Sequence, residues 1–368
     1  MITGYATAAG TARFRARFAR LVARGHYRKL GDLWVSSIGL GTYLGRTDQV
    51  TDDAYEAAIL EALAGGVNVF DTAINYRYQR SERCLGRALA RAFERGLARR
   101  DEIVVSTKGG FVPFDAEPPD DPETYIRQAY VDTGLLEPEE VAASAHSLRP
   151  AFLADQLARS RANLGLETVD LFYLHNPETQ LESGAEAAGL ERIRRAIGWT
   201  EEARTAGTVR AAGLATWNGL RVPPGSPGHL PLLGLVAPAA AERPIVAIQL
   251  PLNLAMPEAL AAPTQEIEEA SVPVLVAARF AGLAVFASAS LLQGRLTDGL
   301  PPEIESVFSG LETDAQRALQ FTRSAPGVTT ALVGMSSAEH VRENLVLAQH
   351  EPATTEALQA LFAGGVSG

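Results

Sequence analysis

Cysteine and long apolar runs are nearly absent from this sequence. Cys84 is the only cysteine in 368 residues, which excludes an internal disulfide and a cysteine-bound structural zinc. The longest apolar stretch, residues 272–287, is interrupted by Pro273 and Arg279. It therefore falls short of the about 20 consecutive apolar residues of a membrane-spanning helix. We expect a protein of a reducing compartment, the cytoplasm, with no membrane span.

Basic residues are outnumbered, and lysine is almost missing. The chain has 33 Lys and Arg against 43 Asp and Glu, a formal net charge of −10, which argues against a protein that coats nucleic acid. Lys29 and Lys108 are the only lysines. Because a lysine ammonium is compact and its pKa is easily shifted, Lys108 becomes a candidate functional residue. The expected partner is a small molecule, and the oligomeric state stays open.

Residues 1–32 form an arginine-rich N-terminal extension. Within it, residues 11–28 carry apolar side chains at helical spacing, namely Phe14, Phe18, Leu21 and Val22. One interpretation is a transit peptide or a membrane-surface helix. We favour the other, a helix that packs these side chains on the domain and turns its arginines to water.

Eight short β-rich runs recur along the chain. They span residues 36–42, 67–73, 102–108, 169–175, 209–216, 245–253, 283–289 and 329–335. Helical patterns lie between them over residues 52–66, 81–96, 150–165, 191–207 and 314–324. Alternating strands and helices predict parallel strands with right-handed crossovers. Eight such units favour a single α/β domain over residues 1–368, a (β/α)8 TIM barrel, although an open sheet with extra edge strands has the same count.

In such barrels the chemistry takes place at the carboxyl ends of the strands. The polar residues there are Asp71, Lys108, His175, Thr216, Gln249, Asn253, Ser288, Ser290 and residues 334–337. We expect them to face one shared pocket. Residues 111–150 are too long for a simple connection and leave from this end, so they form a candidate lid-like insertion. Residues 219–243, rich in proline and glycine, form a second insertion.

A proton-transfer site is predicted at the ends of the second, third and fourth strands. A tyrosine phenol, with a pKa of about 10, is a poor acid at neutral pH unless a cation lowers its pKa. Lys108 is placed to do this for Tyr76, which follows Asp71 by five residues. Asp71 would keep the buried ammonium charged, and the imidazole of His175 would lie beside the phenol.

Taken singly, these four residues also have ordinary explanations. An aspartate such as Asp71 commonly forms a turn, and a lysine such as Lys108 commonly carries a surface charge. A histidine such as His175 can be buried in the core, and Tyr76 can pack in a lid. Tyr78, two residues later, is the alternative candidate for the acid. Each of these explanations suits one residue taken alone. A shared site accounts better for four such residues at neighbouring strand ends.

Seven motifs occur in order between residues 36 and 345: GVNVFDTAINY, VVSTKGG, DLFYLHN, GTVRAAGLATWN, VAIQLPLNL, ASLLQGRL and ALVGMSSAEHVRENL. Together they resemble the aldo/keto reductase superfamily, of which the chain looks like a divergent member. The resemblance implies hydride transfer between NADPH or NADH and a carbonyl, with a tyrosine as general acid in reduction and general base in oxidation. The family's Asp, Tyr, Lys and His fall on Asp71, Tyr76, Lys108 and His175.

No GxGxxG follows the first strand and no P-loop motif occurs, so a cofactor phosphate is expected near the last two strands. Ser336 and Ser337 would begin a helix whose free N–H groups attract it. By resemblance, the cofactor-binding residues are Gly41, Thr42, Asn176, Thr216, Gln249, Ser288, Leu291, Gly294, Ser336, Ser337, His340, Glu343 and Asn344. The last five match the family's adenosine-binding segment. NADP(H) is expected in preference to NAD(H), with no metal.

Several positions depart from the family pattern, and they cluster on the cofactor. Many NADPH-preferring members have a lysine where Gly334 stands and an arginine where His340 stands, so positive charge for the 2′-phosphate is lost. The Ser-Asn pair that holds the nicotinamide amide corresponds to Ala215 and Thr216, and the stacking aromatic to Ser288. Either compensating contacts exist, or cofactor binding is weak.

Three functions fit these residues. The leading one is NAD(P)-dependent reduction of an aldehyde or ketone, or oxidation of the corresponding alcohol or sugar. The second is a nucleotide-binding regulatory or weakly active protein, since the family resembles potassium-channel beta subunits. The third is a barrel lyase or isomerase that uses Lys108 as a base. Five aromatic residues either line a substrate pocket or form a lid core, namely Phe111, Phe114, Tyr125, Tyr130 and Trp217.

Overall fold

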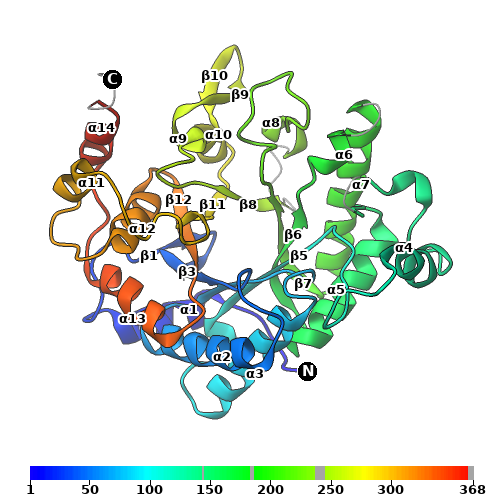
Figure 1. Cartoon of the computed structure of the whole chain (residues 1–368), viewed down its shortest axis with the longest axis horizontal. Coiled ribbons are helices and arrows are strands. Elements are labelled where there is room, and N and C mark those ends of the chain that lie inside the picture. The colour runs from blue at the N-terminus through cyan, green and yellow to red at the C-terminus, as the bar shows by residue number, and fades with distance from the viewer. Residues whose placement is uncertain (143–144, 183–185, 237–244, 364–368) are drawn as a thin grey trace.

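The computed structural model describes residues 1–142, 145–182, 186–236 and 245–363. Eight parallel strands close into a barrel in the order β3-β4-β5-β6-β7-β8-β11-β12, at the centre of Figure 1. Their bounds are β3 Ile38–Gly41, β4 Val69–Asp71, β5 Val104–Gly109, β6 Val169–His175, β7 Val209–Ala215, β8 Ile245–Pro251, β11 Ala284–Ser288 and β12 Val328–Gly334. All eight coincide with predicted strands, and the (β/α)8 barrel is confirmed.

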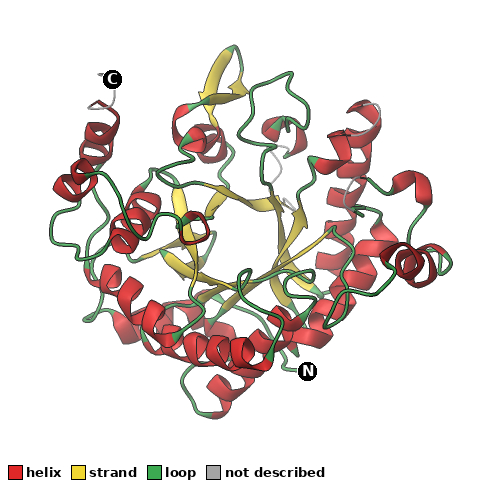
Figure 2. Ribbon diagram, in the orientation of Figure 1, coloured by secondary structure: helices red, strands yellow, loops and turns green. Residues whose placement is uncertain are grey.

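Helices surround this barrel (Figure 2). The longer ones are α1 Ala8–Phe18, α2 Gln49–Ala64, α3 Arg80–Glu94, α5 Pro150–Leu164, α7 Glu186–Thr205, α12 Asp314–Ser324, α13 Ala338–Leu345 and α14 Thr355–Ala363. The shorter ones are α4 Pro122–Ile126, α6 Thr179–Glu182, α8 Leu232–Leu235, α9 Glu258–Ala261, α10 Val274–Phe280 and α11 Pro302–Val307. Single turns are η1 Arg100–Glu102, η2 Arg127–Val131, η3 Pro138–Glu140, η4 Leu292–Gly294 and η5 Val346–Gln349. All five predicted helices are present.

Two hairpins lie outside the barrel, and sequence patterning predicted neither. They are β1 Tyr27–Leu30 with β2 Leu33–Ser36, and β9 Pro263–Ile267 with β10 Ala270–Pro273. The first hairpin buries Leu30 and Leu33 in one apolar cluster with Val104, at the start of β5. It therefore closes the end of the barrel where the strands begin, and the opposite end remains for a pocket.

The N-terminal helix packs on the barrel as predicted, but it is shorter than the pattern suggested. Phe14 is buried, and Arg13 and Arg17 pair with Glu102 at 2.8 and 2.6 Å. The helix ends at Phe18, and Leu21 is 65% exposed. The expectation that Leu21 packs on the domain is therefore wrong, because the chain leaves the helix before reaching that position.

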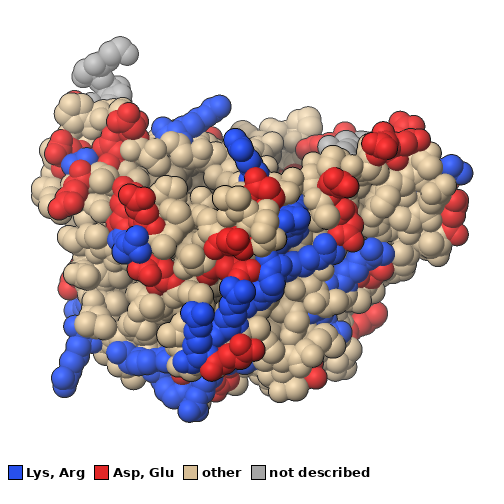
Figure 3. Space-filling model, turned by 60° about the horizontal axis from the view of Figure 1, so that its bottom comes forward, with Lys and Arg blue, Asp and Glu red and all other residues tan. Residues whose placement is uncertain are grey.

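Arginines on α3 are balanced by carboxylates on α2. Arg87 and Arg91 both pair with Glu56, at 2.5 and 2.7 Å, and Arg80 pairs with Asp52 at 2.8 Å. On the face turned forward in Figure 3, Lys and Arg form a band with Asp and Glu beside it. These three arginines thus join α3 to α2. None of the described helices is both long and apolar enough to cross a membrane.

The insertion at 111–150, of which residues 143–144 lie outside the described part, forms a small core of its own. Val112, Tyr130 and Leu136 are buried together there with Phe152 of α5. In Figure 1 its helix α4 lies to one side of the barrel, away from the barrel axis. The second predicted insertion contains α8, and its residues 237–243 lie outside the described part of the chain.

Candidate active site

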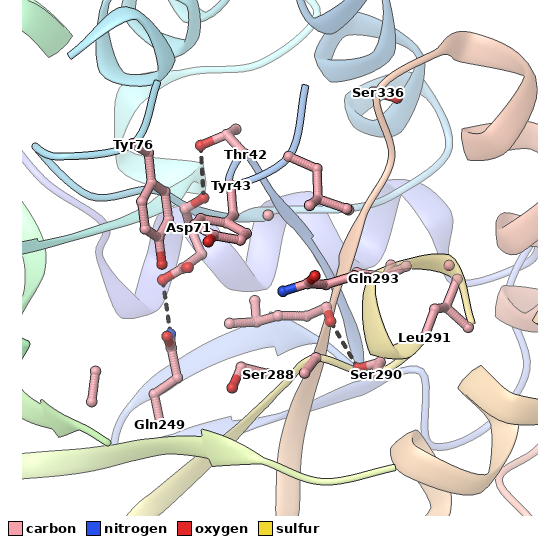
Figure 4. A pocket seen from close by; sticks show the side chains of 18 of the residues that line it. Thr42, Tyr43, Asp71, Tyr76, Gln249, Ser288, Ser290, Leu291, Gln293 and Ser336 are labelled. Carbon is pink, nitrogen blue, oxygen red and sulfur yellow. Dashed lines mark hydrogen bonds between the residues drawn. The ribbon is translucent and has the colours of Figure 1, made fainter. Parts of the chain in front are cut away.

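A cavity of about 820 Å³ opens at the carboxyl ends of the barrel strands. Figure 4 shows Asp71, Tyr76 and Gln249 on one side, with Ser290, Leu291 and Gln293 across from them. The predicted residues that line it are Asp71, Tyr76, His175, Gly41, Thr42, Asn176, Thr216, Gln249, Ser288, Ser290, Leu291, Gly294, Gly334, Ser336, His340, Glu343 and Asn344. Residues from all eight barrel strands, or from the loops that follow them, thus meet in one place.

Four predicted residues do not line the cavity, and one of them, Met335, is fully buried. Lys108 is 1% exposed and lies behind Asp71 and Tyr76. The side chain of Ser337 caps α13, where its Oγ accepts a hydrogen bond from the His340 N–H. Asn253 was expected in the pocket, and instead its Nδ2 donates to the carbonyl of Ala289 at 2.9 Å. Lys108 therefore acts on the pocket only through its neighbours.

The Lys108 ammonium joins Asp71 to Tyr76. Its Nζ donates to Asp71 Oδ2 at 2.6 Å, to the Thr72 carbonyl at 2.8 Å and to Tyr76 Oη at 3.2 Å. The other oxygen of Asp71, Oδ1, accepts from Ser106 Oγ at 2.7 Å and from Gln249 Nε2 at 2.9 Å. All three ammonium protons and both carboxylate oxygens have partners, so the ion pair holds the phenol in one position.

The pKa values of Lys108 and Tyr76 are both raised, but for different reasons. Burial lowers the pKa of Lys108, but attraction to Asp71 and Tyr76 outweighs it, so the pKa is raised and the lysine stays charged. Burial raises the pKa of Tyr76, and Lys108 only partly offsets this. Lys108 thus acts in the predicted direction, yet the expected net lowering of the phenol's pKa is wrong. The phenol is protonated at neutral pH, which suits a proton donor.

His175 ends β6 beside the phenol. The two rings lie 5.9 Å apart, edge to face. Burial, and then the positive charge of Lys108, holds the pKa of His175 well below its usual value. The ring is therefore neutral and can donate through one nitrogen only. Its Nδ1 is buried without a hydrogen-bond partner.

His146, from the insertion, supports the His175 backbone, and nothing in the sequence singled it out. Gln180 Nε2 donates to His146 Nδ1 at 2.9 Å, so the proton of the neutral ring is on Nε2. His146 Nε2 then donates to the carbonyl of His175 at 2.7 Å. Burial lowers the pKa of His146 to about 4. The insertion therefore positions a predicted catalytic residue.

The backbone around this contact is unusual. Gly110 has a φ of +147°, and a Cβ there would lie 2.8 Å from His146 Nε2 and 2.9 Å from the His175 carbonyl oxygen. Only glycine fits such a place. Asn176 is left-handed with a φ of 47°, a conformation that asparagine tolerates better than most residues. Its N–H donates to the Ala215 carbonyl at 2.6 Å, which ties the end of β6 to β7.

The aromatic residues divide into two groups. Phe111 and Trp217 line the cavity, whereas Phe114, Tyr125 and Tyr130 pack in the core of the insertion. Phe111 is the only described residue of the insertion that reaches the cavity. A covering role for the rest of the insertion stays a prediction.

Two further residues shape the cavity wall without having been predicted. Tyr43 lines it, with its ring 4.9 Å from that of Tyr76. Glu178, 2% exposed, accepts the N–H groups of Trp217, Asn218 and Gly219 at 2.6, 3.0 and 3.3 Å. It thereby holds the loop that carries Trp217. In the sequence, the only indication of this role was that Glu178 is a carboxylate shortly after a predicted strand.

Besides His175 Nδ1, three buried polar atoms of lining residues have no partner among the described residues. They are Asn75 Oδ1 near Tyr76, Thr216 Oγ1 at the end of β7 and Asn344 Oδ1 on α13. Buried polar atoms are nearly always hydrogen-bonded. These three span the cavity from its catalytic end to α13, so they indicate an elongated polar ligand.

The cavity joins carboxylates, hydroxyls and amides, and the described residues contain no group of three or more His, Cys, Asp or Glu that could hold a metal ion. A protonated phenol in contact with a fixed ammonium, next to a neutral imidazole, can pass a proton to or from an oxygen of a bound molecule. This arrangement is the strongest chemical feature of the described residues.

Comparison with known proteins agrees with the barrel fold. The model of the aldo/keto reductase family matches residues 37–299. An aldo/keto reductase from Klebsiella pneumoniae, solved with NADP and acetate, is 21% identical with a TM-score of 0.60, covering 93% of this chain and 95% of that chain. An aldo-keto reductase from Bacillus halodurans in its holo form is also 21% identical, with a TM-score of 0.61 over 92% of this chain and 95% of that one. At this identity the structures support the fold alone.

Among curated proteins, a D-threo-aldose 1-dehydrogenase from Pseudomonas sp is 29% identical over 167 residues, 45% of this chain and 45% of that protein. The match thus spans less than half the length of that relative. The family match covers most of the chain, including every strand from β3 to β11. It supports an oxidoreductase, and the resemblance first seen in the motifs is confirmed: this chain belongs to the aldo/keto reductase family.

Proposed function

We propose that the chain is an NAD(P)-dependent oxidoreductase that reduces an aldehyde or ketone, or oxidises the corresponding alcohol or sugar, with Tyr76 as the general acid and base. The observation that carries this is the contact of Lys108 Nζ with Asp71 Oδ2 and with Tyr76 Oη, at 2.6 and 3.2 Å, at the wall of the cavity. It provides a proton donor and a fixed charge that stabilises the donor after the proton has left.

The cavity suits a nicotinamide dinucleotide. Its unpartnered atoms at Asn75, Thr216 and Asn344 are spread along its length, as a long ligand with polar groups at both ends requires. Gln249 uses its Nε2 on Asp71 and keeps its carbonyl oxygen for an amide donor. Thr216 and Gln249 would then hold the nicotinamide, and Ser336, Glu343 and Asn344 would hold the adenosine. When bound, the nicotinamide would supply or accept the hydride.

The protein's own residues handle the proton. In reduction the Tyr76 Oη–H donates to the carbonyl oxygen of the substrate, and in oxidation the phenolate accepts the proton from the alcohol. Lys108 stabilises the phenolate, and Asp71 keeps Lys108 charged. The neutral His175 ring hydrogen-bonds the same oxygen and orients it. Tyr43, Phe111 and Trp217 exclude water from the reacting group.

The lysine-base alternative is disfavoured. A general base must reach its substrate and be unprotonated. Lys108 does not line the cavity, and its pKa is raised by Asp71 and Tyr76 against the effect of burial. No described feature favours a purely regulatory role, which makes turnover the deciding measurement.

The test is a substitution of Tyr76 with a matched control two residues away. Tyr76→Phe removes the proton donor and should lower kcat by about 10²–10⁴-fold, while affinity for NADH or NADPH, followed by nicotinamide fluorescence, changes little. Tyr78→Phe makes the same chemical change on a ring that packs against Phe114, outside the cavity, and should leave both unchanged. The substrate panel contains aldehydes, ketones and aldoses.

Three results would overturn the proposal. Failure of both NADH and NADPH to bind would remove the redox function altogether. Full activity of Tyr76→Phe would exclude Tyr76 as the acid. Tight nucleotide binding with no turnover of any carbonyl or sugar would show that the chain is a nucleotide-binding regulatory protein and not an enzyme.

A further inference from the structure

The backbone directly after Tyr76 is strained. Arg77, Tyr78 and Gln79 have φ angles of 48°, 54° and 69°, so three successive residues lie in the left-handed region. In this region the Cβ of an L-residue comes too close to the following carbonyl oxygen, and of the ordinary residues only glycine, asparagine and aspartate adopt it readily. Such strain persists only where the surrounding structure holds it in place, and it is typical of functional sites.

The side chain of Arg77 holds this turn against α2. It is 2% exposed, and its Nη2 lies 2.5 Å from Asp52 Oδ1. Asp52 does not depend on Arg77 for charge balance, because Arg80 Nη2 lies 2.8 Å from Oδ2 of the same carboxylate. Arg77 Nη1 is buried without a partner among the described residues, which is costly for folding. A left-handed backbone and an unsatisfied donor together indicate that stability alone does not explain this arginine.

The same guanidinium also holds the loop after β3, residues 42–48. Its Nε donates to the carbonyl of Arg46 at 2.8 Å, and its Nη2 lies 3.5 Å from the carbonyl oxygen of Asp48. Residues 43–47 are exposed, and within the described part of the chain no backbone–backbone hydrogen bond fixes them. Besides Arg77, Tyr55 of α2 donates from its Oη to the Leu44 carbonyl at 2.8 Å. A loop with so few supports opens easily when one of them is lost.

Loop 42–48 forms the cavity wall next to the proposed acid. Tyr43 and Leu44 line the cavity, and the ring of Tyr43 lies 4.9 Å from that of Tyr76 (Figure 4). Arg77 does not line the cavity. It is joined to Tyr76 by the peptide bond and to the loop by its guanidinium, so one buried side chain fixes both the backbone that carries the phenol and the loop whose ring faces it.

We propose that Arg77 is a positioning residue for the proton transfer, which rests on the role proposed above for Tyr76. Paired with Asp52, its guanidinium holds the left-handed turn and loop 42–48 together, and so keeps the phenol at its place beside Lys108. Tyr76 Oη lies 3.2 Å from Lys108 Nζ, and a shift of the turn changes this distance. A misplacement of about 1 Å at a reacting group can lower a rate by about 10²-fold.

The experiment compares Arg77→Gly with Arg80→Ala on the full chain. Arg77→Gly removes the guanidinium and also relieves the strain at this position, because glycine adopts a positive φ readily. It should lower kcat by about 10–10²-fold and speed hydrogen exchange of the amides of residues 43–48, measured by mass spectrometry. Arg80→Ala removes a second arginine from the same carboxylate, and no described contact joins that side chain to loop 42–48. It should leave kcat and exchange unchanged.

Two further measurements separate positioning from a loss of folding. Free guanidinium ion at low concentration should restore part of the kcat of Arg77→Gly, because it can bind between Asp52 and the loop carbonyls. It should not raise the kcat of Tyr76→Phe. Arg77→Lys keeps a positive charge beside Asp52, but a single ammonium does not reproduce the spread contacts of a guanidinium. This milder variant should also lower kcat and speed exchange in the loop, and it serves as the test if Arg77→Gly does not fold.

The outcomes separate the inference from the proposed function. Full kcat in Arg77→Gly would overturn the inference and leave the proposed function standing. An equal loss of kcat in Arg80→Ala would assign the effect to the charge of Asp52 and also overturn it, as would a loss of kcat without faster exchange in loop 42–48. If wild type turns over no carbonyl or sugar, the proposed function fails and the catalytic role of Arg77 fails with it. Unchanged exchange in Arg77→Gly would then overturn its hold on the loop as well.

Discussion

Lys108→Met tests how much the buried ammonium contributes to proton transfer. In the wild type, Nζ lies 3.2 Å from Tyr76 Oη. Coulomb attraction between two unit charges at that distance is about 5 kcal/mol at an effective dielectric constant of about 20. This is equivalent to roughly a 10³–10⁴-fold change in the acidity of the phenol. Loss of the ammonium should therefore lower kcat by about 10³-fold, within the usual range for acid–base catalysis.

The same substitution also leaves Asp71 buried without its counterion, so a stability effect must be separated from the catalytic one. Lys108→Met and Asp71→Asn should each destabilise the fold by about 3–5 kcal/mol, because each isolates a buried charge. The double variant removes both charges, and its loss should be smaller than the sum by about 2–3 kcal/mol. Its activity should stay low, because no cation faces Tyr76.

The assay combines unfolding in urea with kcat measured in both directions. If the double variant regained activity together with stability, Lys108 would be a structural residue only. Strictly additive stabilities would contradict the tight coupling of the two side chains. A loss of kcat of less than tenfold in the folded Lys108→Met variant would refute the stabilisation of the phenolate by the Lys108 charge.

Three further predictions concern pH dependence and the backbone near His175. Since burial raises the pKa of Tyr76 above its usual 10.0, reduction should be nearly independent of pH from 6 to 9, while oxidation should rise about tenfold per pH unit as phenolate forms; an oxidation rate that falls from pH 7 to 9 would contradict this. Burial lowers the pKa of His146 from 6.5 to about 4. As the pH falls, the His146 imidazole is therefore protonated in the unfolded chain before it is protonated in the folded one. The free energy of unfolding should decrease between pH 6.5 and pH 4. His146→Asn should reduce the dependence of the free energy of unfolding on pH in this range by about 1.4 kcal/mol per pH unit, as measured by urea titrations. An equal pH dependence in wild type and variant would exclude the effect. Gly110→Ala should lower the free energy of unfolding by about 2–4 kcal/mol through backbone strain and close contacts. The control Gly134→Ala, at a glycine with positive φ but open space around it, should lower it by about 1 kcal/mol. Equal losses of stability in thermal unfolding would rule out the contact at Gly110.

The barrel was predictable because its signal is local and repeated. A parallel strand buried on both faces has the pattern of a short β-rich run, such as residues 169–175, and helices such as α2 and α5 end at a glycine, Gly65 and Gly165. The N-terminal part was less predictable. Its hairpin at 27–36 has a mixed pattern, because one end plugs the barrel while the rest is half exposed, and Leu21 has the helical spacing of a core residue without the neighbours of one.

The candidate site was predictable as a set of residues, but its electrostatic balance was not. Strand ends converge in any such barrel, so the meeting of Asp71, Tyr76 and His175 followed from their order in the chain. The pKa of Tyr76 depends on how deeply the whole cavity wall buries it, and that burial outweighed the nearby ammonium. His146 became a partner of His175 only because the insertion folds back onto β6.

The sequence by itself determined the barrel and the family and predicted the four residues of the candidate proton-transfer group, since these depend on short patterns and their order. It indicated Asn176 only as a cofactor-binding residue by resemblance, and the tertiary structure added a left-handed turn that ties β6 to β7. Only the tertiary structure decided which charges share the cavity, because Lys108 lies behind its wall and Glu343 lies on it. Distances between residues far apart in the chain decide electrostatics, and a linear pattern does not contain them.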